Sequence, residues 1–199
     1  MIEVSAAMVK ELRAKTGSGI MDCKEALKEA EGEIEKAVEY LRKKGLASAS
    51  KRANRETSQG VVYSYIHMGG KIGVLVEVNC ESDFVAKTEG FQEFVKNVAM
   101  HIAAAAPAGM APSDISEDIV AKEREIYRER ALEQGKPEKV VDKIVDGQIT
   151  KFFKDSCLMS QVYIRDSKMT IEELTKETIA KVGENVRIRR FARFQLGQD

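Results

Sequence analysis

Hydrophobic residues near the start of the chain recur at helical spacing in three short runs. The glycines that close these runs are Gly17, Gly32 and Gly45. Ser5 can cap the first predicted helix, whereas Ile20 and Met21, beside the loop "TGSG", fit no buried face. Helices this short are unstable singly, so we expect residues 1–45 to pack as a three-helix bundle.

The pattern changes twice after residue 45. Residues 46–59, "LASASKRANRETSQ", are small and polar and lack periodicity, which predicts a linker. Apolar and polar residues then alternate in "GVVYSYIHM" and "IGVLVEVNC", two segments joined by Gly69, Gly70 and Lys71. Alternation on both sides of a double glycine predicts a β-hairpin.

The second half of the chain returns to helical spacing. A helix is predicted from Phe91 to Ala106, and two amphipathic segments at about 116–156 are expected to form a helical hairpin. The segment "VYIRD" (162–166) is a possible short strand, a helix begins at Thr170, and "NVRIRRFARFQL" predicts a final strand. We therefore expect an α+β fold whose antiparallel-sheet core occupies residues 60–199.

Composition narrows the class of protein. The 199 residues are 43% hydrophobic, enough for a sizeable core, and the formal net charge is +0. Three widely spaced cysteines, Cys23, Cys80 and Cys157, predict neither a disulfide framework nor a zinc module. The first residues lack the apolar segment of a signal peptide, and no apolar run is long enough to span a membrane. We expect a cytoplasmic protein.

Residue types that support catalysis occur without a convincing arrangement. Cys80, His101, Glu81 and Asp83 could in principle form a nucleophilic site, but the cysteine and histidine fall on different predicted elements. Cys80 instead alternates with buried valines on a predicted strand, while His101 could face either a core partner or an outside surface. No phosphate-binding glycine loop or nucleophile elbow is present. The sequence indicates a binding protein without catalytic residue, metal ligand or cofactor.

The segment "NCESDFVAKTEGF" (79–91) places an aromatic residue beside a carboxylate at the end of a predicted strand. The residues alone favour a structural explanation, in which Asp83 caps a short helical turn and Phe84 packs into the sheet. An exposed, functional Phe84 is the alternative.

Three long stretches resemble the bacterial elongation factor Ts family. They are "VKELRAKTGSGIMDCKEALKEAEGEIEKAVEYLRKKG", "GVLVEVNCESDFVAK" with "FQEFVKNVAMHIAAAAP", and "GKPEKVVDKIVDGQITKFF". The resemblance implies a guanine-nucleotide exchange factor for the translational GTPase elongation factor Tu. It further implies that the first three helices form a ubiquitin-associated-like domain, and that residues from 135 to 153 belong to a protruding helical hairpin.

The resemblance also implies which residues contact the partner. The family's Thr-Asp-Phe-Val element corresponds to Ser82, Asp83, Phe84 and Val85. Phe84 is implied to enter between helices of the partner beside the nucleotide, and Asp83 to disturb the magnesium environment. Further partner contacts are implied for Arg13, Ile20, Met21 and His101.

Chain length carries an implication about assembly. Longer family members have a core of two similar halves, whereas this chain has material for one. We therefore expect a homodimer through the sheet, which would give a two-plus-two complex with elongation factor Tu. An exposed sheet edge favours such pairing.

Two other functions remain open from the residues. The chain could be a general protein-interaction module whose first domain binds a helical or ubiquitin-like ligand. It could also be a nucleic-acid-binding accessory of translation, although balanced charge and missing stacking aromatics disfavour direct binding of nucleic acid. The basic patch of that accessory would contain Lys51, Arg52, Arg55, Arg187, Arg189 and Arg190.

Overall fold

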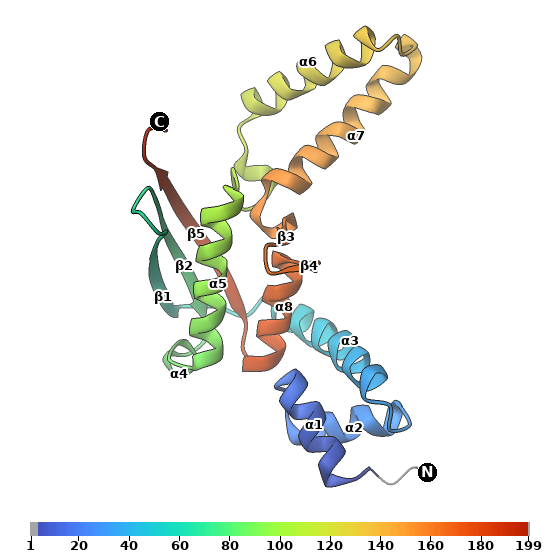
Figure 1. Ribbon diagram of the computed structural model, residues 1–199, viewed down its shortest axis with the longest axis vertical. Helices are drawn as coiled ribbons and strands as arrows, with labels where there is room; N and C mark the ends of the chain where they lie inside the picture. Colours follow the sequence, from blue (N-terminus) through green and yellow to red (C-terminus); the bar gives the residue numbers. More distant parts are fainter. Residues whose placement is uncertain (1–3, 199) are drawn as a thin grey trace. The chain divides into compact units, whose positions relative to one another are not determined.

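The structure is a computed structural model that describes residues 4–198, and it combines helices with a three-stranded antiparallel sheet (Figure 1). The α+β class is therefore confirmed. The helices are α1 (Ala6–Thr16), α2 (Ile20–Glu29), α3 (Ile34–Arg52), α4 (Asp83–Ala86), α5 (Glu89–Ala105), α6 (Glu117–Glu133), α7 (Glu138–Ser156) and α8 (Ile171–Val182). The strands are β1 (Gln59–Ile66), β2 (Ile72–Cys80), β3 (Val162–Tyr163), β4 (Asp166–Thr170) and β5 (Val186–Gln195).

The chain divides into two compact units. One unit contains the residues up to 64, together with 75–97 and 173–191, and the other contains 65–74, 98–172 and the residues from 192 onward. The three-stranded sheet has the order β1-β2-β5, so β2 is its central strand and β1 and β5 are its edges.

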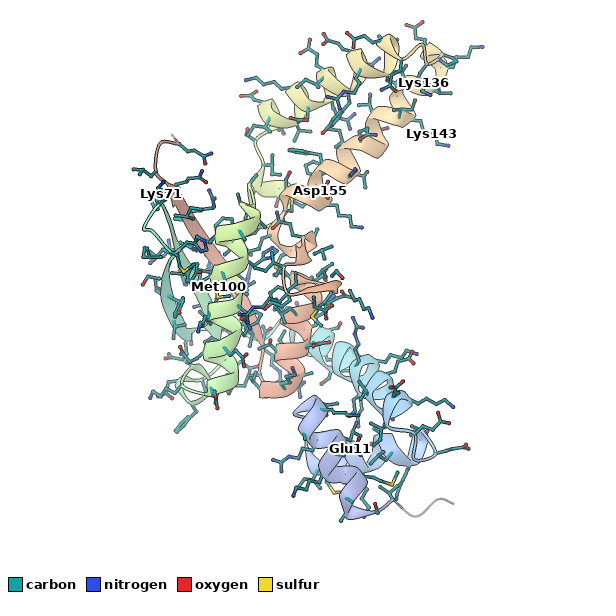
Figure 2. The ribbon with its side chains drawn as sticks, viewed as in Figure 1. Glu11, Lys71, Met100, Lys136, Lys143 and Asp155 are labelled. Carbon is teal, nitrogen blue, oxygen red and sulfur yellow. The ribbon has the colours of Figure 1, made fainter. Side chains whose placement is uncertain are left out.

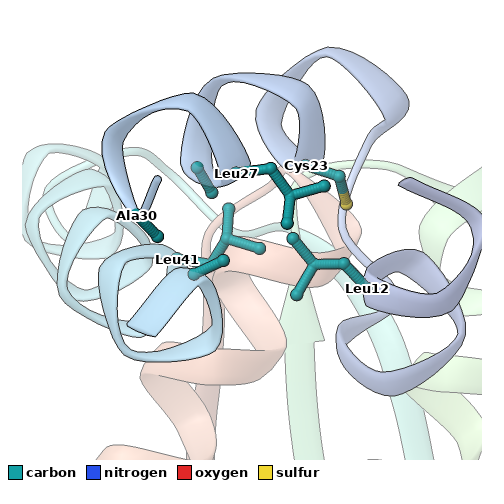
Figure 3. Packing of buried hydrophobic residues seen from close by; sticks show 7 residues of the cluster. Leu12, Cys23, Leu27, Ala30 and Leu41 are labelled. Carbon is teal, nitrogen blue, oxygen red and sulfur yellow. The ribbon is translucent and has the colours of Figure 1, made fainter. Parts of the chain in front are cut away.

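Helices α1, α2 and α3 share one apolar core, as the periodicity predicts (Figure 3). Its buried residues are Leu12, Cys23, Ala26, Leu27, Ala30, Ala37 and Leu41. Ser5 caps α1 by accepting a hydrogen bond from the Met8 amide, 3.3 Å away, and Gly17 ends the helix at φ +67°. Each helix thus gains from the bundle the stability that it lacks alone.

Helix α3 does not end at Gly45, and residues 46–52 are helical rather than part of a linker. A Cβ atom built on Gly45 would lie only 2.9 Å from the Ala180 Cβ in α8. Glycine at this position therefore permits close packing between two helices, which a local rule for helix ends cannot distinguish from a stop signal. Within the predicted linker, only the residues between Arg52 and Gln59 lie outside a helix or strand.

The predicted β-hairpin is present as β1 and β2. Gly69 and Gly70 occupy the turn at φ +83° and +69°, a conformation that glycine adopts readily. Alternate residues of β2 are buried, namely Val74, Val76, Val78 and Cys80. Gly60 lies at φ +140°, where a Cβ atom would be 2.1 Å from the carbonyl oxygen of Val78. Only glycine allows this close approach of β1 to β2.

The helical hairpin of α6 and α7 is also present, with Gly135 in its turn at φ +72°. Figure 2 shows Lys136 at this turn and Asp155 near the opposite end of α7. A small apolar core joins the helices, and Arg124 pairs with Asp146 at 2.9 Å. The hairpin core is formed by Ala131, Val141, Val145 and Ile149.

The single strand predicted at 162–166 is wrong in detail. Val162 and Tyr163 form β3, Ile164 and Arg165 form a turn, and β4 pairs with β3 as a separate two-stranded antiparallel sheet. Alternating apolar positions cannot reveal a turn in such a short segment. The final predicted strand is confirmed as β5.

No helix within residues 4–198 is long and apolar enough to cross a membrane.

Candidate functional site

Helix α4 is a single turn that begins directly after the central strand β2 ends. Ser82 precedes it with extended backbone angles, φ −126° and ψ 156°, and its Oγ accepts a hydrogen bond from the Val85 amide at 3.3 Å. The residue that caps the turn is therefore Ser82, and Asp83 is the first helical residue. The sequence "ESDF" produces this turn because serine supplies the N-cap and aspartate favours the first turn.

Phe84 points away from the protein and is 80% exposed. The structural explanation that the residues alone favoured is thus wrong on both points, because Asp83 is not the cap and Phe84 does not pack into the sheet. Ala86, on the opposite side of the turn, is buried and 6% exposed. Burying a phenylalanine is worth roughly 2 kcal/mol or more, so its exposed ring makes Phe84 a candidate for contact with a partner.

Side chains around α4 bond to its backbone. The Cys80 thiol donates to the Ser82 carbonyl at 3.1 Å, and the Thr88 hydroxyl donates to the Val85 carbonyl at 2.8 Å. The side-chain amide of Gln92 donates to the Ala86 carbonyl at 2.6 Å. These bonds hold the turn from both ends, although a four-residue helix has little stability of its own.

The Asp83 carboxylate lies on the exposed side of α4 beside Phe84. Lys87 donates a hydrogen bond to Asp83 Oδ2 at 2.7 Å, and this bond together with the positive charge of Lys87 lowers the pKa of Asp83. Asp83 is therefore ionised at neutral pH, and its second carboxylate oxygen can interact with a partner.

The bundle residues that are expected to contact the partner lie at the surface of the bundle. Ile20 and Met21, in the first turn of α2, are 57% and 76% exposed, in agreement with their poor fit to a buried face. Arg13 and Ile20 line the same shallow pocket of about 550 Å³. The other residues of this pocket are Val4, Ala6, Val9, Lys10 and Lys24, so an apolar floor is bordered by positive charge.

His101 is buried, with no exposed surface, in the unit that contains residues 98–172. Its Nε2 lies 3.0 Å from Gln161 Oε1, and the Gln161 side-chain amide donates to the Asp155 carbonyl at 2.7 Å. Burial lowers the pKa of His101, because it disfavours the charged imidazolium, and His101 Nδ1 has no hydrogen-bond partner. In this structure His101 offers no atom to a partner, so the expected direct contact needs correction.

The three cysteines lie in the interior of the protein. All three cysteines are buried free thiols, and burial raises the pKa of Cys80 and of Cys157, which disfavours the nucleophilic thiolate. Across the described residues 4–198, no group of three histidine, cysteine, aspartate or glutamate side chains could hold a metal ion.

An exposed aromatic on a hydrogen-bonded turn and exposed apolar residues on a three-helix bundle are features of a binding protein. A family model for elongation factor TS matches residues 3–198. This chain belongs to the elongation factor Ts family. The elongation factor Ts of Desulfosudis oleivorans is 64% identical over 195 residues, which is 98% of this chain and 98% of the relative.

Other elongation factor Ts relatives match over similar lengths. That of Geobacter metallireducens is 57% identical over 99% of this chain and 91% of its own. That of Moorella thermoacetica is 55% identical over 98% of this chain and 96% of its own. The match to the family therefore covers both compact units.

Two site residues of this elongation factor Ts chain were missed by sequence reasoning. Glu184 and Asn185 form the turn between α8 and β5, and both bond to the segment before α4. Asn185 is a buried polar residue, 4% exposed, next to an apolar strand. A buried asparagine needs partners, but periodicity does not identify which ones, because they lie more than 100 residues away.

Two of the six basic residues considered for nucleic-acid binding, Arg55 and Arg190, have acidic partners in this family member. Arg190 donates to Glu77 at 2.7 Å, and the Arg55 guanidinium lies 3.5 Å from Glu81. These contacts neutralise part of the predicted patch, so the structure offers little support for a nucleic-acid interface.

Proposed function

We propose that this elongation factor Ts chain is a guanine-nucleotide exchange factor for the GTPase elongation factor Tu. The observation that carries the proposal is the 80% exposed Phe84 on a turn whose backbone is hydrogen-bonded by the surrounding side chains. An exposed aromatic side chain on a hydrogen-bonded backbone can enter an apolar gap in a partner without the cost of first ordering that backbone.

The physical basis of exchange is a competition between two ligands. GDP is bound mainly through phosphate contacts and Mg²⁺, and Mg²⁺ requires near-ideal octahedral geometry. A factor that binds best to a distorted, nucleotide-poor partner must weaken nucleotide binding by the same coupling free energy. Exchange by this route needs no catalytic group, and we assign no catalytic residue, metal or cofactor to the chain.

We assign the turn of α4 to the nucleotide side of the partner. Phe84 is the group that separates helices of the partner, and the ionised Asp83 carboxylate acts on the magnesium environment. Ser82 and Val85 complete the contact surface, Ser82 as the cap that shapes the turn and Val85 as its half-buried neighbour.

The bundle supplies a second contact surface. Arg13, Ile20 and Met21 are exposed at or beside one pocket, where an apolar side chain of the partner can bind beside an acidic one. Typical coupling between sites is about 1–3 kcal/mol, so strong acceleration of release requires more contacts than Phe84 alone provides. Residues 1–45 serve as this partner-binding domain, and residues 60–199 as the core that carries α4.

Burial changes the role that we assign to His101. Its side chain bonds to Gln161, which in turn bonds to the end of α7, so His101 holds the C-terminal part of α5 in place. We therefore propose that His101 influences partner binding through packing and not through direct contact.

The chain acts as a homodimer through its sheet, in a two-plus-two complex with elongation factor Tu. Edge strands β1 and β5 are available for pairing. The last residues of β1 and of β5 belong to the same compact unit. In that unit the Leu196 amide donates a hydrogen bond to the Lys71 carbonyl at 2.8 Å. Four large apolar side chains near these strand ends are exposed. These side chains are Ile66, Met68, Phe194 and Leu196, which are 65%, 87%, 71% and 77% exposed.

The complex forms in the cytoplasm, without direct contact to nucleic acid or membrane. Buried free thiols suit a reducing compartment, and balanced charge gives no general attraction to nucleic acid. The proposal is tested by stopped-flow release of a fluorescent GDP from elongation factor Tu. Added protein should accelerate release in a saturable manner, and an unchanged rate would exclude the exchange function.

A further inference from the structure

The turn between α8 and β5 bonds to the residue that caps α4. Glu184 Oε2 accepts a hydrogen bond from the Ser82 amide at 2.9 Å, and Glu184 Oε1 accepts one from the Ser82 hydroxyl at 2.6 Å. Ser82 and Glu184 are 102 residues apart in the chain and belong to the same compact unit. Both carboxylate oxygens of Glu184 are thus bonded to a single residue.

These bonds reach the backbone of α4 through one hydroxyl group. The Ser82 hydroxyl donates a hydrogen bond to Glu184 and accepts one from the Val85 amide at 3.3 Å. Bonds to a carboxylate are stronger than bonds between neutral groups. Glu184 therefore fixes the rotamer of Ser82, and Ser82 in that rotamer caps the turn.

The turn that carries Glu184 is itself held in place. The next residue, Asn185, donates its amide to Glu81 Oε1 at 2.6 Å. The Asn185 side chain donates to the carbonyls of Ala53 and Arg55 at 3.2 and 2.8 Å. Glu184 is consequently a fixed point relative to the strand end from which α4 begins.

Phe84 depends on such outside support. Its side chain is 80% exposed, so packing against the protein contributes little to its orientation. Its helix has four residues, too few to be stable without external bonds. The point and direction from which the side chain leaves the protein therefore follow from the position of the α4 backbone.

We propose that Glu184 is a positioning residue for Phe84. The carboxylate holds Ser82, Ser82 caps α4, and the capped turn fixes the backbone position from which Phe84 reaches the partner. This inference rests on the proposed exchange function, in which Phe84 enters elongation factor Tu. Preorganised contact groups need such support, because small displacements reduce the interaction that they make in the distorted partner.

The test compares variants of the full chain in stopped-flow release of fluorescent GDP from elongation factor Tu. Glu184→Ala removes both bonds, and Glu184→Gln retains one acceptor oxygen. Glu93→Ala is the matched control, because Glu93 is an exposed glutamate on α5. Each of the three substitutions is also made together with Phe84→Ala, and thermal unfolding verifies that every variant is folded.

We expect Glu184→Ala to reduce the release rate at saturating factor by roughly tenfold, as for loss of hydrogen bonds to a charged group. The half-saturating concentration should change by less than about twofold, since most of the contact surface is retained. Glu184→Gln should lie between Glu184→Ala and wild type, and Glu93→Ala should match wild type. In the Phe84→Ala background, Glu184→Ala should have no further effect.

Hydrogen exchange of the free protein gives a readout that does not depend on the partner. The amides of Ser82 and Val85 should exchange at least about tenfold faster in Glu184→Ala, and at the wild-type rate in Glu93→Ala. If Glu184→Ala does not fold, Ser82→Ala breaks the hydroxyl bonds from the other side and should show the same dependence on Phe84.

Two outcomes would overturn the inference while leaving the exchange function intact. In one, wild type accelerates release and Phe84→Ala does not, yet Glu184→Ala equals wild type. In the other, the losses from Glu184→Ala and Phe84→Ala multiply, so that Glu184 acts independently of Phe84. Failure of wild type itself to accelerate release would instead overturn the exchange function and the inference together.

Discussion

Lys87 Nζ lies 2.7 Å from Asp83 Oδ2, and Phe84, the residue that follows Asp83 in the sequence, is 80% exposed. The pair spans one turn of α4 and lowers the pKa of Asp83. The carboxylate beside the exposed ring therefore remains charged throughout the pH range in which translation takes place. In the proposed complex, a charged carboxylate next to the ring can compete for magnesium or for its ligands.

Replacing Asp83 should affect exchange in a magnesium-dependent manner. Asp83→Asn keeps the size of the side chain and removes its charge, so we expect slower GDP release at millimolar Mg²⁺. When Mg²⁺ is chelated, the ratio of wild-type to variant rates should approach one, because no ion remains to be disturbed. Stopped-flow release measured with and without chelator provides the comparison. An equal ratio under both conditions would show that Asp83 acts by some other route.

The buried His101 predicts a pH dependence of stability. Its pKa is lowered from 6.5 in the folded protein, so the unfolded chain binds more protons as the pH falls through that value. The free energy of unfolding should therefore decrease between about pH 7.5 and 5.5, and His101→Gln should flatten this dependence. Urea unfolding at several pH values measures the effect. Ile119→Gln, at an exposed residue of α6 that does not titrate, is the control and should leave the slope unchanged.

Two glycines should respond to alanine in opposite directions. Gly60→Ala places a Cβ atom 2.1 Å from the Val78 carbonyl oxygen at φ +140°, so it should destabilise the protein by about 2 kcal/mol or more. Gly147 lies within α7, and a Cβ atom added there would meet nothing within 4 Å, so Gly147→Ala should stabilise by about 0.5–1 kcal/mol. Chemical denaturation of both variants tests the pair. A neutral Gly60→Ala would contradict the close strand contact.

A charged side chain at the end of the sheet should disrupt the proposed homodimer. Wild type should sediment as a homodimer, and Phe194→Lys should shift it to monomer, because a lysine in an apolar interface loses its hydration. Ile126→Lys, at an exposed apolar residue of α6, is the matched control and should remain dimeric. Sedimentation of wild type as a monomer would remove the basis for a two-plus-two complex.

Sequence patterns predicted the structure correctly where it depends on residues that are close together in the sequence. The core of the bundle and the buried face of β2 follow helical and alternating periodicity, and both are present as predicted. The same local reasoning was wrong at Gly45, whose role depends on Ala180 in a distant helix. A glycine that permits close packing and a glycine that ends a helix have the same appearance in the sequence.

The candidate site shows the same limit. Family resemblance implied an exposed Phe84, as the structure has it, whereas the residues alone favoured a buried ring, because an aromatic after a strand usually packs. Neither approach found Glu184, since a hydrogen bond across 102 residues leaves no periodic signal. Resemblance also could not indicate that His101 is buried, because burial depends on how α5 packs against the segment around Gln161.

The central claim is that the exposed ring of Phe84 accelerates release of GDP from elongation factor Tu. The direct measurement is stopped-flow release of fluorescent GDP with wild type, Phe84→Ala and the control Ile119→Ala, an exposed apolar residue of α6. Binding of each protein to nucleotide-free elongation factor Tu is measured in parallel. We predict that wild type and Ile119→Ala accelerate release, and that Phe84→Ala binds but accelerates it far less. Equal acceleration by Phe84→Ala and wild type would contradict the claim.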